Sequence, residues 1–352
     1  MSSKPPSRIV ELAMRIAINT AKLDIYLTSH NLPTPSFDIN GPLDSQIPTS
    51  EKEIQAAQTA IIDDTQELRR LILGPRDYLM SYTHNELISQ QAITRFKIAH
   101  SFPINTETTF AEISTSTNLP EPIVRKFIRH AILKDIFIEP GPGIIAHNAV
   151  SRLLVEDEVL HDWVGSCTND FWPSAANTCD ALERFPNSQE PNETGFARAN
   201  NSTSSIYTIF SQSPHRASRF ANAMKCFTSG PGFQLSHLIN NPLWQTLPPH
   251  STVVDLGASK GHVCFALAEK YSQLNFIAQD LDSVIDTIPN KKFPRVKFIS
   301  HDFFTTQPIQ KAEVYFFRWI FHNWSDEYCV KILRTCLFIC RSEAIWPKSS
   351  RL

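Results

Sequence analysis

Residues that could perform chemistry follow apolar runs late in the chain, and the most informative of them stand in a glycine turn. The stretch 253–262 reads VVDLGASKGH, so a short apolar run ends in a turn that contains Gly257 and Gly261. The apolar stretch 263–268 then has the composition of a buried helix. Strand, glycine turn and helix open a βαβ unit, in which the backbone passes close to a ligand and the helix start offers free N–H groups. The pattern predicts a nucleotide-type site.

Acidic residues follow the next two apolar runs. The run 275–278 leads to Asp280, and the run 296–299 leads to Asp302. In an open parallel sheet, the carboxyl ends of the strands line the ligand crevice. Asp280 stands about 20 residues after the glycines, where an acid can accept both hydroxyls of a ribose. Either acid alone could be a turn or cap residue, but the two together favour a nucleoside ligand.

A histidine follows the fourth apolar run. The run 314–321 leads directly to His322, and Ser325 is placed to cap the next helix. We therefore expect His322 in a short loop at the mouth of the site. A lone histidine is more often structural, but an imidazole accepts protons near neutral pH, so this one is suited to act as a base.

The same turn admits a second interpretation. Residues 257–261 match G-x-S-x-G, the nucleophile elbow of serine hydrolases, with Ser259 as nucleophile and His322 as the base of a triad. Three observations disfavour it: the upstream chain is helical rather than stranded, no oxyanion segment of the His-Gly-Gly type precedes the turn, and Asp280 and Asp302 would have no joint role.

The N-terminal part predicts helices. One amphipathic helix begins after Ser7, and prolines between 33 and 48 mark a linker. A second helix starts near Ser50, and Gly74-Pro75 is predicted to end it. Such helices pack either on their own chain or on a twin subunit.

Residues 110–154 have the pattern of a winged helix. Two helices joined by a turn precede two short strand-like runs around a Gly-Pro-Gly turn. The second helix carries four basic residues that could meet phosphates, or could form the solvated face of a docking module: Arg125, Lys126, Arg129 and His130. The net charge of −2 and the pI of about 6.6 favour the docking module and argue against nucleic acid as an obligate partner.

Residues 155–245 are predicted to be helical, with aromatic-rich interruptions and a mobile loop over 185–205. Aromatic residues at such spacing are most often core. Trp172 and Phe227 are nevertheless candidates for lining a flat aromatic ligand.

Composition bounds the class of protein. The 352 residues are enough for two or three domains, and 42% of them are hydrophobic. We expect no signal peptide and no membrane span, because no apolar run is long enough. Seven cysteines without a CxxC pair are typical of reduced thiols, so we expect a cytoplasmic protein. No cluster of metal-ligating residues is visible.

Residues 253–336 resemble the cofactor domain of class I S-adenosylmethionine-dependent O-methyltransferases, in the group that resembles caffeic acid O-methyltransferase. Four motifs carry the resemblance: 254–262 (VDLGASKGH), 279–285 (QDLDSVI), 300–303 (SHDF) and 317–329 (FRWIFHNWSDEYC). The sequence as a whole resembles the fungal branch of this family, which modifies polyketides and other aromatic secondary metabolites. The upstream winged helix also fits, since that family uses it for dimerisation.

The resemblance implies a role for each matching residue. Gly257 and Ala258 let the backbone approach the methionine part of S-adenosylmethionine, and Asp280 holds its ribose. Asp302 and Phe303 flank the adenine. Two further roles follow: Arg318 stands near the amino-acid end of the cofactor, and His322 removes the proton from a phenol. The resemblance also implies a small aromatic substrate, a homodimer and no metal.

The expected architecture is α/β, with a Rossmann-like methyltransferase sheet after a mainly α winged-helix dimerisation domain. We expect a dimerisation domain over 1–154, a substrate-pocket segment over 155–245, a cofactor domain over 246–340 and an atypical tail over 341–352. Only four strands are predicted, so we expect an incomplete C-terminal edge of the sheet, as in a truncated enzyme. An inactive relic that only dimerises is the alternative function. Ala258 and Ser259 replace two glycines of the family turn, so we expect this turn to fit the cofactor less well.

Overall fold

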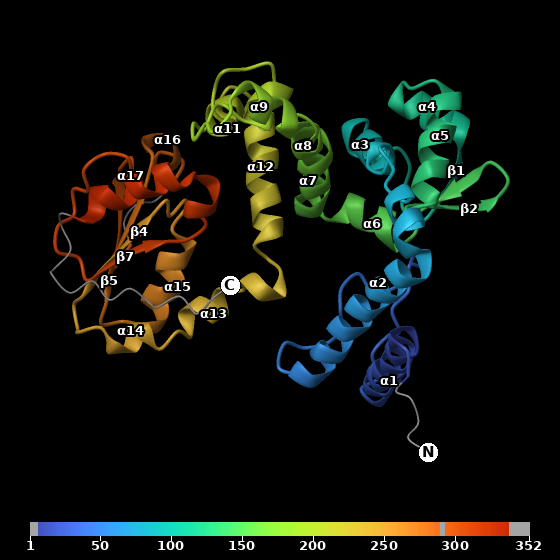
Figure 1. The fold of residues 1–352 in the computed structure, drawn as a ribbon, viewed down its shortest axis with the longest axis horizontal. Coiled ribbons are helices and arrows are strands. Elements are labelled where there is room, and N and C mark those ends of the chain that lie inside the picture. Colours follow the sequence, from blue (N-terminus) through green and yellow to red (C-terminus); the bar gives the residue numbers. More distant parts are fainter. Residues whose placement is uncertain (1–5, 289–292, 338–352) are drawn as a thin grey trace. The chain divides into compact units, whose positions relative to one another are not determined.

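The computed structural model describes residues 6–288 and 293–337 (Figure 1). It divides into two compact units. One comprises the described chain up to Pro173 together with Ser213–Phe227, and the other comprises Ser174–Gln212 together with the described chain from Thr228 onward. The predicted helical segment 155–245 is thus shared between the units. The predicted tail over 341–352 lies outside the described residues.

The first unit begins with two long helices that pack on each other, α1 (Arg8–Ser29) and α2 (Lys52–Met80). Arg15 forms an ion pair of 3.0 Å with the buried Asp64 between them. The predicted break at Gly74-Pro75 is present, because Gly74 leaves the helical conformation, but a further helical stretch follows it directly. Gly74 kinks the helix with φ of 69° and ψ of 169°, and the chain then continues as helix to Met80. Glycine tolerates this positive φ, and proline is well suited to begin the next helical turn.

The predicted pair of helices and the hairpin are present in the same unit. Its elements are α3 (Ile88–Arg95), η1 (Ile98–His100), β1 (Glu107–Thr109), α4 (Phe110–Thr117), α5 (Glu121–Ile132), β2 (Ile138–Gly141) and β3 (Ile144–Ala146). The three strands form an antiparallel sheet in the order β1-β3-β2. Ile113, Ile128 and Ile145 are fully buried between the helices and this sheet. A capping box between Thr109 and Glu112 begins α4.

The basic residues of α5 have partners inside this module. Arg125 pairs with Glu121, and its guanidinium also lies 4.5 Å from the ring centre of Phe110. Arg129 forms an ion pair of 2.8 Å with Glu139 of the hairpin. These contacts hold the hairpin and α4 against α5.

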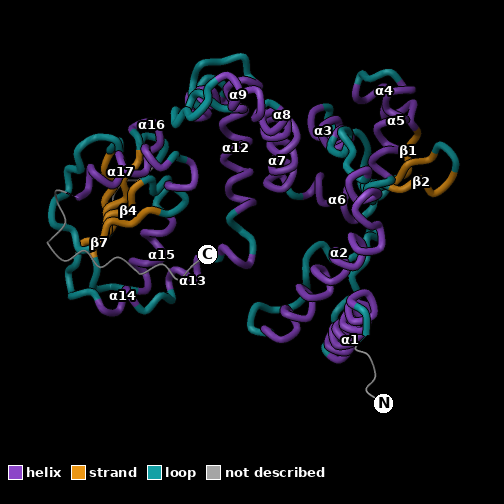
Figure 2. The backbone as a smooth tube through the Cα atoms, in the orientation of Figure 1, coloured by secondary structure: helices purple, strands orange, loops and turns teal. Residues whose placement is uncertain are grey.

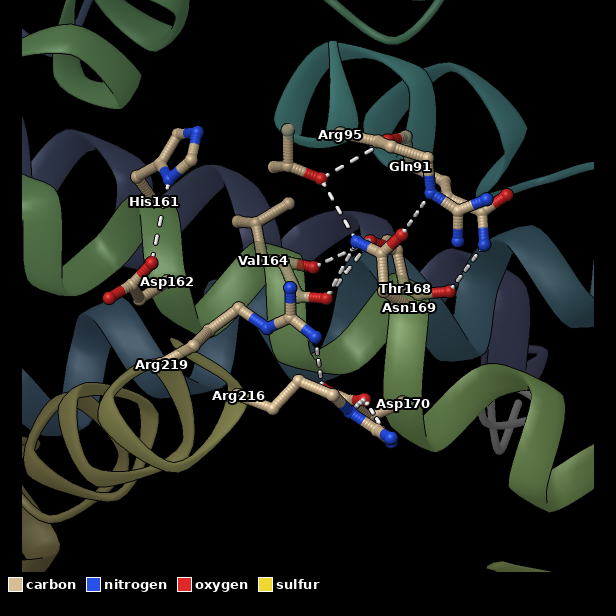
Figure 3. A network of polar contacts seen from close by, with 12 residues as sticks. Gln91, Arg95, His161, Asp162, Val164, Thr168, Asn169, Asp170, Arg216 and Arg219 are labelled. Atoms are coloured by element: carbon tan, nitrogen blue, oxygen red, sulfur yellow. Dashed lines mark hydrogen bonds and ion pairs between the residues drawn. The ribbon is translucent and has the colours of Figure 1, made fainter. Parts of the chain in front are cut away.

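Helices complete the first unit: α6 (Ala149–Glu156), α7 (Glu158–Ser166), the π-helical turn η2 (Cys167–Phe171) and α12 (Pro214–Phe227). Helix α8 (Trp172–Ala176) follows η2 directly. Figure 3 shows the polar network at η2, where Asp170 faces Arg216 and Arg219 of α12. The predicted pocket residue Phe227 stacks on Trp163 with ring centres 5.7 Å apart. Helix α12 is therefore tied to α7 and η2 by both ionic and aromatic contacts.

A buried histidine is expected to make the first unit less stable in acid. His147 is 2% exposed and stacks on Phe102, and its Nδ1 lies 3.0 Å from Ser151 Oγ. Burial lowers its pKa from 6.5 to about 4, and the neighbouring His100 adds to this. Between these values only the unfolded state binds the proton. The free energy of unfolding therefore falls, by about 3 kcal/mol in all, as the pH drops from 6.5 to about 4.

Urea denaturation at several pH values checks this expectation. His147→Gln removes the titrating group. In this variant the free energy of unfolding should therefore fall less between pH 6.5 and about 4 than it does in the wild type. His30→Gln, at an exposed position in α1's C-cap, is the control and should leave the loss unchanged. The same pH dependence in wild type and His147→Gln would show that this imidazole is not responsible.

The second unit begins with short helices: α9 (Thr178–Arg184), α10 (Gly195–Ala199), α11 (Ile206–Ser211), η3 (Pro231–Phe233), α13 (Leu235–Ile239) and α14 (Leu243–Thr246). The segment 185–205, predicted as a mobile loop, lies outside helices and strands except for one short helix, α10. Thr194 caps α10 through Ala197 N–H, and Phe196 is buried. The polar composition of 185–205 gave no indication that this turn of helix is buried.

The second unit is built on a four-stranded parallel sheet, seen as orange strands in Figure 2. Its strands are β4 (Thr252–Leu256), β5 (Asn275–Asp280), β6 (Val296–Ser300) and β7 (Val314–Phe317), in the order β6-β5-β4-β7. The helices are α15 (His262–Lys270), α16 (Asp282–Ile285), η4 (Phe321–Asn323) and α17 (Asp326–Leu337). One face of the sheet packs on α15, and the other buries Val254 and Leu256 with Cys336 of α17. The predicted Rossmann-like sheet is confirmed.

None of the helices that the structure describes combines the length and hydrophobicity of a membrane-spanning segment.

Candidate cofactor and catalytic site

The glycine turn lies at the carboxyl end of β4 and is closely packed. Gly257 and Gly261 have φ of 75° and 74°. A Cβ on Gly257 would lie 2.4 Å from Ile320 Cδ1, and a Cβ on Gly261 would lie 2.7 Å from Phe298 Cζ. The N–H groups of Gly257 and Ala258 both donate to the Gln279 carbonyl of β5, at 2.9 Å. Positive φ favours glycine at both positions, and at Gly261 the Phe298 ring also leaves no space for a Cβ.

Ser259, which replaces a glycine of the family turn, keeps the left-handed conformation with φ of 51°. Its N–H donates to Asp280 Oδ2 at 2.7 Å. This charge-assisted hydrogen bond offsets the strain of a side chain at positive φ. No histidine of the described chain hydrogen-bonds to the Ser259 hydroxyl, so the contacts of this residue are those of a turn rather than of a nucleophile.

Asp280 ends β5, which neighbours β4. Its Oδ2 accepts the N–H of Ser259 and its Oδ1 accepts the N–H of Leu281, at 2.7 and 2.8 Å. Burial raises the pKa of the carboxyl group, and the two N–H donors oppose this effect. Each carboxylate oxygen can accept a further hydrogen bond. The group is therefore fixed in position and still able to accept two ligand hydroxyls.

Asp255 is a second acid at the turn, and it was missed as a site residue. It is 3% exposed near the end of β4, and burial raises its pKa to about 7. Cys264 Sγ donates to it at 3.6 Å, which lowers the pKa, while the charge of Asp280 raises it and that of Arg318 lowers it. The sequence did contain a signal for this residue, because Asp255 is an acid inside the otherwise apolar run 253–256. A cation bound beside Asp255 and Asp280 would favour their ionised forms.

Arg318 follows β7 directly. Its Nη2 donates to the Phe233 carbonyl at 2.9 Å, which ties the segment after β7 to η3. Burial lowers the pKa of the guanidinium, and the charge of Asp255 opposes this. The next residue, Trp319, has φ of 60° and packs edge-on against Phe233, with ring centres 5.0 Å apart.

The position of His322 differs from the prediction in one respect. The strand ends at Phe317 rather than at Phe321, because the backbone turns at Trp319 and enters the single turn η4. His322 lies in η4, is exposed, and its ring centre is 5.4 Å from that of Trp319. No residue in the described ranges hydrogen-bonds to its imidazole. As far as the described residues show, both imidazole nitrogens are therefore available to hydrogen-bond to a ligand.

Asp302 and Phe303 follow β6 and face different ways. Asp302 is exposed, and its Oδ1 accepts the N–H of Phe304 at 2.9 Å, so it stabilises its own turn. Phe303 is half-buried, and its Cε1 would lie 3.9 Å from a Cβ on Gly257. The structure thus brings Phe303 to the glycine turn, together with Asp280 and Ile320 after the neighbouring strands.

Strand order places the acid and the histidine on opposite sides of the turn. β5, which ends in Asp280, lies on one side of β4, and β7, which leads to His322, lies on the other. Nothing in the described ranges groups three or more His, Cys, Asp or Glu side chains as a metal ion would require.

Comparison with known proteins identifies the family. An O-methyltransferase domain family matches residues 188–344. O-methyltransferase AMT9 of Alternaria alternata is 37% identical over 345 residues, which cover 94% of this chain and 79% of that protein. The chain belongs to the O-methyltransferase family. The chlorophenol O-methyltransferase of Trichoderma longibrachiatum is 33% identical over 342 residues, which cover 94% of this chain and 73% of that enzyme.

Solved structures share the fold of this O-methyltransferase. OxaC in complex with SAH and oxaline has a TM-score of 0.71 at 19% identity, over 96% of this chain and 82% of that one. LepI in complex with SAM has a TM-score of 0.65 at 18% identity, over 96% and 85% of the two chains. The family membership sets aside the serine hydrolase interpretation of Ser259.

The cofactor of this family is S-adenosylmethionine, and the turn has the features that it needs. Asp280 offers two acceptor sites to a ribose diol. Burial raises the pKa of Asp255 and of Asp280, and a bound sulfonium or ammonium charge would favour the ionised form of both carboxyl groups. The residues present therefore fit this cofactor.

Proposed function

We propose that this chain transfers the methyl group of S-adenosylmethionine to a phenolic hydroxyl of an aromatic secondary metabolite, with His322 as general base. The single observation that carries the proposal is the placement of Asp280 and His322 on opposite sides of the glycine turn. The printed names of relatives support the acceptor class: one is a chlorophenol O-methyltransferase, and another belongs to a grayanic acid biosynthesis cluster of Cladonia grayi.

In this proposal, residues at the carboxyl ends of several strands bind the cofactor together. The backbone at Gly257 and Ala258 receives the methionine part, Asp280 accepts the ribose hydroxyls, and Asp302 and Phe303 flank the adenine. Arg318 and the buried Asp255, which attract each other, hold the amino-acid end. When bound, S-adenosylmethionine supplies an activated methyl group on a positively charged sulfur.

His322 would accept the phenol proton at an imidazole nitrogen. A phenol with a pKa of about 10 is a poor nucleophile until it loses its proton. The imidazole is exposed and makes no hydrogen bond with the described residues, so either nitrogen can meet an incoming hydroxyl. The remaining task of the protein is to align the acceptor oxygen with the methyl group.

Replacing Asp280 tests the cofactor assignment. Asp280→Asn removes the charge and turns one acceptor into a donor, so we expect affinity for S-adenosylmethionine to fall about 10- to 100-fold. Asp282→Asn changes an exposed acid two residues away and is the matched control. Isothermal titration calorimetry measures both variants. Wild-type affinity in Asp280→Asn would remove this residue from the site.

A direct assay separates the enzyme from the inactive relic. The full chain is incubated with methyl-labelled S-adenosylmethionine and a panel of phenols, and products are identified by mass spectrometry. Label in an ether linkage on a phenol is the expected result. A folded chain that binds the cofactor but methylates none of the panel would favour a relic that only dimerises.

We also propose that the chain forms a homodimer through α1 and α2. Helix α1 presents Met14, Ile18 and Ile25 at 57%, 67% and 67% exposure. Exposed apolar side chains at this density are typical of interaction surfaces. Ile25→Glu is expected to shift the chain from dimer to monomer in sedimentation velocity. Thr20→Glu adds the same charge at an exposed polar position and should remain dimeric. A wild-type monomer would contradict the proposal.

A further inference from the structure

Aromatic rings continue outward from the glycine turn to α11 of the same unit. Trp324, which follows His322 by two residues, packs edge-on against Phe303 and Phe304, with ring centres 6.0 and 4.7 Å apart. Tyr207 of α11 stacks on the same indole at 6.2 Å with an interplanar angle of 28°. Because Phe303 reaches the turn at Gly257, these rings connect Tyr207 to the cofactor site.

Core packing does not account for Tyr207. Helix α11 is held by the buried Ile209 and Phe210, and the Phe210 ring packs edge-on against Phe196 of α10 at 5.2 Å. Tyr207 lies in the first turn of this helix and remains 43% exposed. Part of the Tyr207 ring is therefore exposed to solvent, although Trp324 stacks on the ring. Open aromatic surface next to a nucleoside site can bind a base or a sugar face.

The charge of Asp280 acts on the Tyr207 hydroxyl. Burial raises the pKa of its hydroxyl, and the negative charge of Asp280 raises it further. The phenol is therefore neutral at physiological pH, and it lies close enough to Asp280 to feel that charge. The ring thus stacks on the indole of Trp324 and lies within the electrostatic range of the acid proposed to hold the ribose.

The segment that leads to α11 is anchored to α17. Ser325 Oγ donates to the Gln189 carbonyl at 3.0 Å, and the Tyr328 hydroxyl donates to Glu190 Oε2 at 2.6 Å. Asn192 Nδ2 donates to the Thr203 carbonyl at 2.9 Å, which ties the start of the segment to the residues just before α11. These bonds hold the start of this segment beside α17 within the second unit.

We propose that Tyr207 is a cofactor-binding residue whose ring packs against the adenosine part of S-adenosylmethionine beside Asp280. This inference rests on the proposed function and adds to the site a residue that lies outside all the motifs at the strand ends. The ring provides the contact. Tyr207→Phe is therefore expected to bind as wild type does, whereas Tyr207→Ala loses affinity.

Calorimetric titration of the full chain with S-adenosylhomocysteine tests the proposal. We expect Tyr207→Ala to bind about 10- to 100-fold more weakly than wild type, as for loss of one aromatic stack on a base, and Tyr207→Phe to stay within about threefold. Tyr328→Ala is the matched control, because Tyr328 also stacks on Trp324, at 5.7 Å and 18°. It should bind within about threefold of wild type, although its melting temperature falls.

Three outcomes would overturn the inference. Wild-type affinity in Tyr207→Ala would do so while leaving the cofactor assignment intact. Equal losses in Tyr207→Ala and Tyr328→Ala would show that Tyr207 only supports Trp324. A folded wild type that does not bind S-adenosylhomocysteine would overturn the inference and the cofactor assignment together. Binding without methyl transfer to any phenol would instead contradict the proposed function alone. Melting temperatures of the ligand-free variants identify any that fail to fold.

Discussion

Replacing His322 by alanine is expected to lower kcat for methyl transfer by about 10²- to 10⁴-fold, the usual contribution of a general base. S-adenosylmethionine should bind the variant as it binds the wild type, since His322 and Asp280 lie on opposite sides of β4. Calorimetry and a turnover assay on the same preparation measure the two effects separately. Unchanged turnover would exclude His322 as the base.

The acidity of the acceptor separates a base from a structural histidine. A phenol with a pKa of about 7 is already largely ionised at neutral pH, so it needs little help from a base. The deficit of His322→Ala should therefore shrink with such a nitrophenol and be largest with an unactivated phenol. His322→Gln keeps a polar side chain without the imidazole and should show the same dependence. An equal deficit for all acceptors would indicate that His322 only maintains the loop.

Replacing Asp170 by alanine is expected to destabilise the first unit by about 3–5 kcal/mol, as for other buried ion pairs that lose one partner. Asp170 is 2% exposed. Its Oδ1 accepts from Arg216 Nη2 at 2.8 Å and its Oδ2 from Arg219 Nη2 at 2.7 Å, as Figure 3 shows. Without the carboxylate, two partly buried guanidinium groups face each other.

Hydrogen exchange measured by mass spectrometry locates this effect. Peptides from α7 and α12 should exchange faster in Asp170→Ala, because Asp170 joins η2, which continues α7, to α12. Glu121→Gln removes an exposed ion pair with Arg125 on α5 and is the control, for which we expect a change below about 1 kcal/mol. If α7 and α12 exchange in Asp170→Ala as they do in wild type, the pairing contributes little to stability.

Much of the sheet and its site could be predicted because the signals are local. The glycine turn, the acids at Asp280 and Asp302 and the helix after the turn depend on residues within a few positions of one another, and the structure places each at a strand end. Periodicity and turn chemistry report such features directly. The helical stretch after Gly74 and helix α10 within 185–205 were not predicted, since local composition does not show whether a helix resumes or a turn of helix is buried.

The sequence by itself determined the class of site: a glycine turn, an acid at the end of the next strand and a histidine beyond the last strand. Only the tertiary structure decided that Asp255 is buried enough for a pKa of about 7, that Asp170 joins α12 to η2, and that Tyr207 stacks on Trp324. The partners in the last two contacts are 46 and 117 positions apart in the chain. Burial and charge environment are properties of packed neighbours, so residues that are distant in sequence set them only after folding.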